Sequence, residues 1–320
     1  MYLDHFGMSK APFQIAPDDR FLYLSPKHAK ALVYMNYAVR QPDGFVIITG
    51  EIGCGKSTLV KRLLRKVKGN SVCFHLPFTN LKNNELLGFL ARQAKIGVSQ
   101  SDKVSLIYAL TDYLRDITSC GMPCILIVDE AQNLTQENLE DIRMLAALEG
   151  PNGSMLRVIM LGQPEFMNTV NLSEQMKQRV KLHYHLTGLS REEIPQYIKF
   201  RLEVSGTKNL NLFNEDLMDT IFEITNGIPR LINKICDSML MCAFSESRTK
   251  LLISDFKEVA QDLMMLPSQQ VKKSNTSTNS EDAIARIADS LESLDEKFSR
   301  LISLMDVKKD KKFLSLRTAK

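Results

Sequence analysis

One short run near position 50 carries the residue types that bind phosphate groups. It fits the pattern GxxxxGK[ST] and consists of Gly50, Glu51, Ile52, Gly53, Cys54, Gly55, Lys56 and Ser57, with Thr58 directly after it. Glycines in such a loop let backbone N–H groups wrap the phosphates, and the following helix directs partial positive charge at them. We expect Lys56 to reach the β- and γ-phosphates and the Ser57 hydroxyl to ligate Mg²⁺. Residues 50–58 therefore predict a nucleoside triphosphate site.

A pair of carboxylates follows a second apolar run. Cys124–Val128 predicts a buried strand, and Asp129 and Glu130 come directly after it. An exposed strand end is the simpler interpretation of such a pair alone. When the pair follows a phosphate loop in the sequence, it indicates a catalytic site, because the carboxyl ends of parallel strands face the ligand. We predict that Asp129 holds Mg²⁺ through its water shell and that Glu130 orients and polarises the attacking water.

Two further polar residues could take part in the same chemistry. Gln163 comes just after the predicted strand Leu156–Leu161, where it could lie between Glu130 and the γ-phosphate. A loop glutamine that makes turn contacts is the alternative. Arg179 precedes the predicted strand Val180–Leu186 and could point across a subunit boundary at a neighbour's γ-phosphate. Its spacing alone does not favour that role.

The elements that must position these residues alternate from residue 45 to about residue 190. The strand candidates are Phe45–Thr49, Ser71–His75, Cys124–Val128, Leu156–Leu161 and Leu182–Leu186. The segments between them are long enough for helical crossovers, so we predict an α/β fold with a parallel sheet. Ahead of the sheet, Ser25 as N-cap and Pro26 at the first position predict a helix to about Arg40.

The rest of the chain changes in character several times. Residues 191–266 read as almost wholly helical, which predicts a second, smaller domain after a core at 1–190 that includes an N-terminal extension. Residues 267–280 are polar and predict a flexible linker. Residues 281–306 carry apolar residues at alternating spacings of three and four, which predicts a short coiled coil, with a helix packed on the body as the alternative. Residues 307–320 form a basic tail that we interpret as solvated. The alternative is that the tail makes a weak contact with an anionic partner.

Composition excludes several classes of protein. The chain has 320 residues, of which 44% are hydrophobic and 24% charged, as in a soluble globular protein and unlike a disordered or collagen-like one. The formal net charge of +4 indicates no general attraction to nucleic acid or membranes. No apolar run approaches the roughly 18 residues of a membrane span, and the N-terminus lacks the order of a secretory signal. The six cysteines form no CxxC pair, so we expect free thiols in a reducing cytoplasm.

Short blocks along the chain also match a known family in order and approximate spacing. Besides the phosphate loop they are Met1-Tyr-Leu, Phe6-Gly, Pro12-Phe13, Phe21-Leu-Tyr-Leu-Ser-Pro26, Asp129-Glu-Ala-Gln-Asn-Leu134, Gly162-Gln-Pro-Glu165, Gln178-Arg179, Leu189-Ser190 and Gly227-Ile-Pro-Arg-Leu-Ile-Asn233. With them the chain, over about residues 1–266, resembles the AAA ATPases similar to general secretion pathway protein A. That group includes pilus-biogenesis and exosortase-associated exopolysaccharide ATPases.

The resemblance implies a fold, ligands and further site residues. It implies a five-stranded P-loop core of the ASCE type followed by a helical lid, with ATP and Mg²⁺ as ligands. Gln163 looks like the sensor-1 residue, and Arg179 looks like an arginine finger that acts in trans. Arg230 looks like the sensor-2 arginine that contacts the γ-phosphate in cis, with a surface arginine as the alternative. Secretion-pathway members carry a membrane span and a peptidoglycan-binding domain after the lid, whereas this chain has the linker, heptads and basic tail, so the soluble members look closer.

These expectations predict a Mg²⁺-dependent ATPase that forms homo-oligomers and powers or regulates the assembly of a secretion, pilus or exopolysaccharide system. We expect it in the cytoplasm, with peripheral contact at the inner membrane, and we expect the coiled coil to bind a cell-envelope protein rather than nucleic acid. One alternative is a DNA-associated AAA ATPase of the transposition type, because residues 61–68 form a basic helix. Another is a nucleotide-gated scaffold with little turnover.

Overall fold

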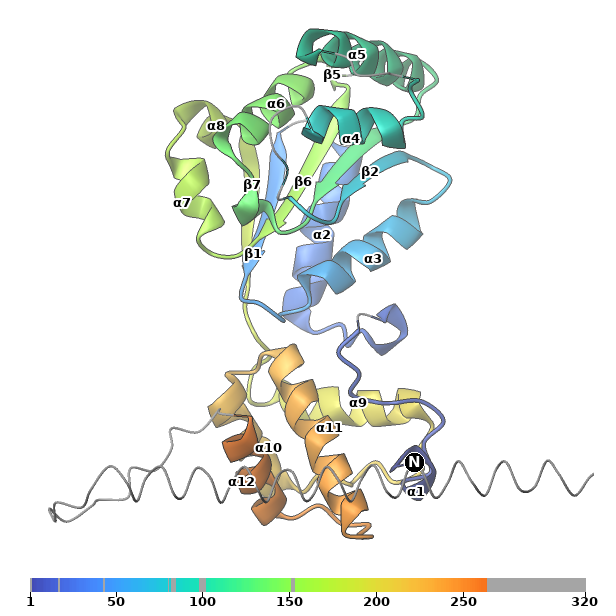
Figure 1. The fold of residues 1–320 in the computed structure, drawn as a ribbon, viewed down its shortest axis with the longest axis vertical. Helices are drawn as coiled ribbons and strands as arrows, with labels where there is room; N and C mark the ends of the chain where they lie inside the picture. Colours follow the sequence, from blue (N-terminus) through green and yellow to red (C-terminus); the bar gives the residue numbers. More distant parts are fainter. Residues whose placement is uncertain are drawn as a thin grey trace, which may run out of the picture. The chain divides into compact units, whose positions relative to one another are not determined.

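The computed structural model describes residues 2–16, 18–42, 44–79, 81, 85–97, 102–150 and 153–263 (Figure 1). The chain divides into two units, Met1–Pro267 and Ser268–Lys320. The second unit lies outside the described residues. The linker, the coiled coil and the basic tail that the sequence predicts after residue 266 lie there too, and they stay predictions.

A parallel five-stranded sheet forms the centre of the α/β core, which confirms the predicted fold. Its strands run in the order β2-β3-β6-β1-β7, and every neighbouring pair is parallel. The strands are β1 Phe45–Gly50, β2 Val72–Leu76, β3 Cys124–Val128, β6 Leu156–Gly162 and β7 Val180–Leu186, with a separate antiparallel pair at β4 Glu149–Gly150 and β5 Gly153–Ser154. In this order β3, β6 and β1 are adjacent. The carboxylates follow β3, Gln163 follows β6 and the phosphate loop follows β1, so all three lie at the same edge of the sheet.

The helices fall into two groups, one around the sheet and one in a separate bundle (Figure 1). They are α1 Tyr2–His5, α2 Pro26–Arg40, α3 Lys56–Val67, α4 Glu85–Gln93, α5 Lys103–Ser119, α6 Gln136–Ala146, α7 Phe166–Asn171, α8 Glu174–Arg179, α9 Glu193–Ser205, α10 Glu215–Thr225, α11 Pro229–Ser245 and α12 Ile253–Asp262, with 3-10 turns η1 Asp19–Phe21 and η2 Ala131–Asn133. The bounds of α2 confirm the helix predicted from its N-cap, where the Ser25 hydroxyl accepts the His28 N–H. Among the described residues, no helix has both the length and the apolar character needed to cross a bilayer.

Helices cover both faces of the sheet, so the central strands are buried on both sides. Successive side chains of β1 point to opposite faces. Phe45 and Ile47 join the cluster formed with α4 to α8, while Val46 and Ile48 join the cluster formed with α2 and α3. Each fully buried side chain of this size contributes roughly 1.5–3 kcal/mol. The phosphate loop therefore extends from one of the best-anchored strands of the molecule.

The bundle of α9 to α12 has its own apolar core, and the start of the chain belongs to it. Phe6, Met8 and Phe13 are buried in the same cluster as the four helices. The hydroxyl of Thr207, just after α9, donates to the carbonyl of Phe6 at 2.8 Å. The N-terminal extension is therefore divided: its first residues pack with the bundle, whereas α2 packs on the sheet. The segment between them must run from the bundle to the core.

Candidate nucleotide site

The phosphate loop connects β1 to α3, and its own backbone carbonyls fix the side chain of Lys56. Gly53 and Gly55 have φ angles of +90° and +97°, in the left-handed region where a Cβ is strained. The Lys56 side chain is buried, and its Nζ donates to the carbonyls of Gly50 at 2.6 Å and Glu51 at 3.1 Å. The loop thus combines exposed backbone, a helix start and a fixed cation, which suits it to hold a phosphate chain.

The two carboxylates after β3 are held by a tight turn. Asp129 is buried, and its Oδ1 accepts the Glu130 N–H at 3.1 Å. Glu130 lies in the left-handed region, with φ +53° and ψ +41°, and leads into η2. Such a conformation costs a non-glycine residue on the order of 1–3 kcal/mol. A carboxylate and a hydroxyl are oxygen ligands of the kind Mg²⁺ takes, so Asp129 and Ser57 fit that ion chemically.

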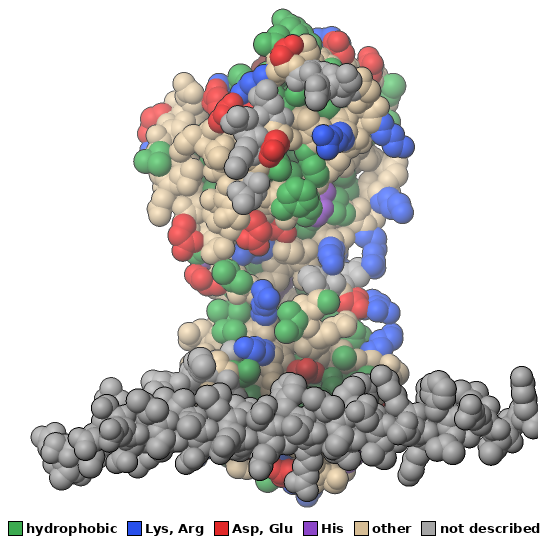
Figure 2. Space-filling model, viewed as in Figure 1, with side chains coloured by type: hydrophobic (Ala, Val, Ile, Leu, Met, Phe, Trp, Pro, Cys, Tyr) green, Lys and Arg blue, Asp and Glu red, His purple; other side chains and the backbone are tan. Residues whose placement is uncertain are grey.

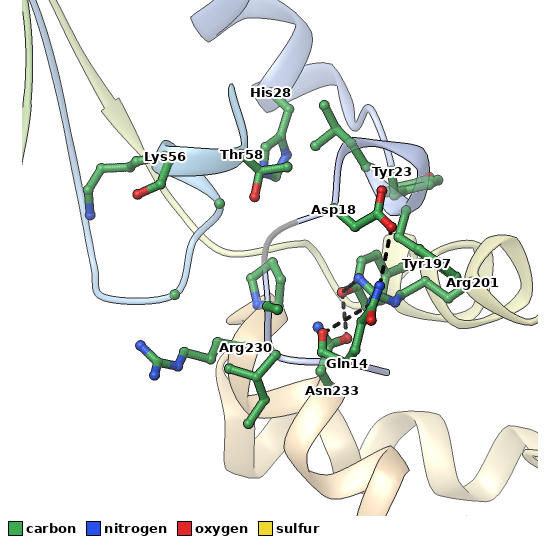
Figure 3. A pocket seen from close by; sticks show the side chains of 18 of the residues that line it. Gln14, Asp18, Tyr23, His28, Lys56, Thr58, Tyr197, Arg201, Arg230 and Asn233 are labelled. Carbon is green, nitrogen blue, oxygen red and sulfur yellow. Dashed lines mark hydrogen bonds between the residues drawn. The ribbon is translucent and has the colours of Figure 1, made fainter. Parts of the chain in front are cut away.

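A cavity of about 340 Å³ opens at the phosphate loop, and three parts of the chain line it (Figure 3). The loop and Glu130 come from the core, a second group from the N-terminal segment, and a third from the bundle. The lining includes Gln14, Asp18, Tyr23, His28, Lys56, Ser57, Thr58, Glu130, Tyr197, Arg201, Arg230 and Asn233. This volume lies within the range of roughly 300–1,000 Å³ that is usual for small-molecule sites. Lys56 marks the phosphate end, and Tyr197 and Arg201 lie on the other side of the cavity (Figure 3).

Arg230 reaches the phosphate loop from the first turn of α11. Its backbone N–H donates to the Gly53 carbonyl at 3.2 Å. A Cβ added at Gly53 would lie only 2.5 Å from the Arg230 Cβ, so the loop and the helix touch. Pro229 occupies the start of the helix, where its fixed φ is favourable. The bundle therefore places this arginine at the cavity, and its contact with the γ-phosphate stays a prediction.

Gly227, just before α11, packs on the backbone of the segment between β7 and α9 and has no room for a side chain. Gly227 has φ +71°, and an added Cβ would lie 1.9 Å from the Leu189 carbonyl oxygen. We expect Gly227→Ala to lower the free energy of unfolding by well over the roughly 1–2 kcal/mol of left-handed strain alone, and to weaken nucleotide binding by moving α11. Gly121→Ala is the matched control, because Gly121 has φ +75° and nothing within 4 Å of an added Cβ. Equal losses in urea unfolding of the two variants would contradict this.

The sheet places Gln163 at the edge that carries the site, although it is not among the described residues that line the cavity, and Arg179 away from that edge. Gln163 directly follows β6, between the phosphate loop and the carboxylates. Arg179 precedes β7, whose Val180 pairs with Phe45 at the start of β1. The phosphate loop follows the other end of β1, about 20 Å away at the rise of a β-strand. Arg179 lines a different hollow, with Gly44 and Arg143. It therefore does not reach the phosphate loop of its own chain.

The fold also brings to the cavity residues that sequence reasoning missed. Arg201 is buried, and its guanidinium donates to the Tyr197 hydroxyl at 3.1 Å and to the Pro12 carbonyl. The Tyr197 hydroxyl in turn donates to Asn233 Oδ1 at 2.6 Å. Arg201 also lies 5.0 Å from the centre of the Phe21 ring. These contacts tie the N-terminal segment to α9 and α11 at the end of the cavity opposite Lys56.

His28 is a second missed residue, and it supports the phosphate loop from α2. Its Nε2 lies 2.9 Å from the Cys54 carbonyl, and its Nδ1 lies 2.7 Å from the Ser25 hydroxyl. Because a carbonyl can only accept, Nε2 carries the proton and Nδ1 accepts from Ser25. Burial lowers the pKa of His28 below its ordinary value of 6.5, and the hydrogen bond to Cys54 opposes that shift. The ring therefore stays neutral at neutral pH.

This burial predicts a loss of stability in acid. The unfolded chain protonates His28 at about its ordinary pKa of 6.5, and the folded chain only at lower pH. The unfolded state then binds more protons below pH 6.5, so the free energy of unfolding decreases as the pH falls through that range. We expect His28→Gln, which keeps a donor for Cys54, to show a shallower decrease between about pH 7 and pH 5. Urea unfolding at each pH measures it, and identical slopes would show that His28 contributes nothing.

Comparison with known proteins agrees with the fold and the phosphate loop. Residues 39–170 match the family model described as an AAA domain. Over 266 residues the chain is 33% identical to general secretion pathway protein A of Aeromonas hydrophila, a match that covers 82% of this chain and 48% of that protein. The chain thus spans about half the length of this relative.

Two solved structures share the architecture. Cdc6p from Pyrobaculum aerophilum superposes with a TM-score of 0.64 at 18% identity, over 79% of this chain and 73% of that one. The Aeropyrum pernix ORC2 protein, in ADPNP–ADP complexes, gives 0.57 at 15% identity, over 77% and 72%. At such identities the likeness concerns the fold alone. The 33% identity and the AAA domain at residues 39–170, taken with the five-stranded sheet and the phosphate loop, lead to one conclusion: the chain belongs to the AAA proteins of the general secretion pathway protein A type.

Proposed function

We propose that this chain hydrolyses ATP with Mg²⁺ and that oligomers of it power or regulate the assembly of a cell-envelope system. The cavity at the phosphate loop carries the proposal, because it brings together Lys56, Glu130 and Arg230 from three separate elements. Phosphoryl transfer relies on positioning and on charge stabilisation, and these residue types supply both.

Each residue has a separate task in the proposed reaction. Lys56 binds the β- and γ-phosphates, and Thr58 lies in the first turn of α3. Ser57 and Asp129 would hold Mg²⁺, which would supply positive charge where the leaving phosphate gains negative charge. Glu130 orients the attacking water, because a carboxylate that is not bound to the metal remains free to accept its proton. Gln163 and Arg230 contact the γ-phosphate from the sheet and from the bundle.

The place of Arg179 supports an oligomer. An arginine that stabilises the transferring phosphoryl group must touch it, and Arg179 lies at the far edge of the sheet from its own phosphate loop. It can therefore complete only a neighbour's site. We propose that subunits associate with Arg179 of one facing the phosphate loop of the next.

The setting in the cell envelope is proposed from similarity. The relative at 33% identity bears the name general secretion pathway protein A, and this chain spans 48% of it. We propose a secretion, pilus or exopolysaccharide system as the machine. We also propose a cytoplasmic location at the inner membrane, with a partner protein bound through the predicted coiled coil at 281–306.

The test is phosphate release by the purified full-length chain in the presence of ATP and Mg²⁺, with EDTA as the control. The proposal expects turnover that EDTA abolishes and added Mg²⁺ restores. Tight ATP binding without phosphate release would instead favour the nucleotide-gated scaffold. Phosphate release that is indifferent to EDTA would contradict the roles of Ser57 and Asp129.

A DNA-associated ATPase remains the alternative because of the outer face of α3. Basic side chains gather on the side of the molecule where this helix lies (Figure 2). The exposed cations of this segment are Lys61, Arg62, Arg65, Lys66 and Lys68. Phosphate contacts lose affinity steeply as salt rises, so a DNA titration at several salt concentrations separates the two functions. Binding with a steep salt dependence and a rise in ATP turnover would favour the alternative.

A further inference from the structure

One side chain joins Glu130 to the loop after β6. Gln132 Nε2 donates to Glu130 Oε2 at 2.6 Å. Its Oε1 accepts the backbone N–H of Gln163 at 3.0 Å. The amide therefore links the carboxylate that we propose to orient water with the residue that we propose to contact the γ-phosphate.

The two partners fix the orientation of this amide. A carboxylate can only accept a hydrogen bond and a backbone N–H can only donate one, so the amide nitrogen must face Glu130 and its oxygen must face Gln163. Rotating the amide by a half turn would lose both bonds. Gln132 therefore has one orientation in which it satisfies both neighbours.

The backbone on both sides is shaped for this contact. The left-handed conformation of Glu130 reverses the chain into η2, so the side chain of Gln132 returns toward Glu130. The Glu130 carbonyl is held in that turn by the hydroxyl of Thr79, a buried residue after β2, at 2.6 Å. On the other side, a Cβ added at Gly162 would lie 3.2 Å from Gln132 Oε1, so a glycine there leaves the amide room.

We infer that Gln132 is a positioning residue for ATP hydrolysis, which orients the Glu130 carboxylate and couples that orientation to the position of Gln163. The inference rests on the proposed function. Within the described part of the chain, Glu130 is among the residues that line the cavity and Gln132 is not, so Gln132 acts through Glu130. Its bond to the carboxylate is charge-assisted and short, of the kind that fixes geometry most firmly. A displacement of Gln163 by the γ-phosphate would move the amide and with it the carboxylate.

The first test replaces Gln132 with methionine, which keeps the length of the side chain and removes both hydrogen bonds. Gln136→Met is the matched control, because Gln136 is exposed at the start of α6. A positioning role predicts a fall in kcat of about tenfold, with an affinity for a fluorescent ATP analogue within about twofold of the unchanged chain. The melting temperature should match that of the control. An unchanged kcat, or a loss confined to stability, would show that Gln132 only supports the turn.

The second test measures the coupling between the two glutamines. Gln163→Ala is made in the unchanged chain and in the Gln132→Met chain, and kcat is compared across the four proteins. Gln163→Ala keeps the backbone N–H that Gln132 accepts and removes the side chain that we propose to contact the γ-phosphate. If the backbone bond transmits that contact to Glu130 through Gln132, the double variant should lose less than the product of the two single losses. Multiplicative losses would overturn the coupling.

A Glu130→Gln variant in the same assay separates the two proposals. No turnover in the unchanged chain would overturn the proposed function, whereas turnover that survives Glu130→Gln would overturn the proposed role of Glu130 and this inference with it. Turnover that Glu130→Gln abolishes, with an unchanged kcat for Gln132→Met, would overturn only this inference.

Discussion

Replacing Lys56 with alanine is expected to weaken ATP binding by about a hundredfold, whereas replacing Glu130 with glutamine is expected to leave binding intact and slow hydrolysis by roughly 10²–10⁴-fold. Lys56 is held within the phosphate loop by the carbonyls of Gly50 and Glu51, and we propose that its charge binds the phosphates. Losing a charged contact of this kind weakens binding by about a hundredfold. Glu130 is proposed to act only on water, so its loss should lower kcat by roughly 10²–10⁴-fold without a comparable change in affinity.

Two measurements check this difference. A titration with a fluorescent ATP analogue gives the affinity, and phosphate release gives the turnover. Lys66→Ala is the control, because Lys66 is an exposed lysine of the same helix and should leave the affinity unchanged. If Lys56→Ala and Glu130→Gln lost affinity to the same extent, the assignment of one residue to binding and the other to catalysis would be wrong.

Replacing Arg179 with alanine is expected to leave ATP binding intact and to lower turnover by roughly 10³–10⁵-fold, the contribution of an arginine finger. The register of β7 on β1 places Arg179 at the opposite end of the strand from the phosphate loop. A loss of turnover without a loss of binding would therefore have to arise at the site of another subunit. Lys177→Ala is the control, because Lys177 is an exposed residue of the same helix.

Mixing inactive subunits tests whether this effect acts in trans. An Arg179→Ala subunit keeps an intact phosphate loop, and a Lys56→Ala subunit keeps its arginine. At an interface between the two, one complete site can form, so the mixture should recover part of the turnover that each protein lacks alone. No recovery at any ratio, in mixtures that sedimentation shows to contain mixed oligomers, would indicate a structural arginine.

The parts of the fold that the sequence predicted are those with a local signal. The strands that carry the site are short apolar runs, and the helix α2 begins at a serine cap followed by proline. The phosphate loop and the carboxylates after β3 could be assigned because the glycines, the lysine and the strand end act within a few residues of one another. Such patterns predict structure well because the interactions that they reflect lie within one element or turn.

The parts that the sequence did not predict depend on packing between distant segments. Phe13 is as apolar as any strand residue, and nothing in its neighbourhood indicates that it packs with α9 to α12 rather than on the sheet. Arg201 lies on α9 and His28 on α2, and both line the same cavity although these helices are far apart in the sequence. Gln132 stands in the block after β3, but its role becomes visible only when the turn brings its amide to both Glu130 and Gln163.

The most direct test of the central claim, that a complete site needs two subunits, is the ATP turnover per subunit measured across a range of protein concentrations. Sedimentation at the same concentrations gives the fraction of the chain in oligomers. If Arg179 completes a neighbour's site, turnover per subunit should be low in the monomer, rise with the oligomeric fraction and level off when assembly is complete. A turnover per subunit that stays constant while the monomer converts to oligomer would contradict the account.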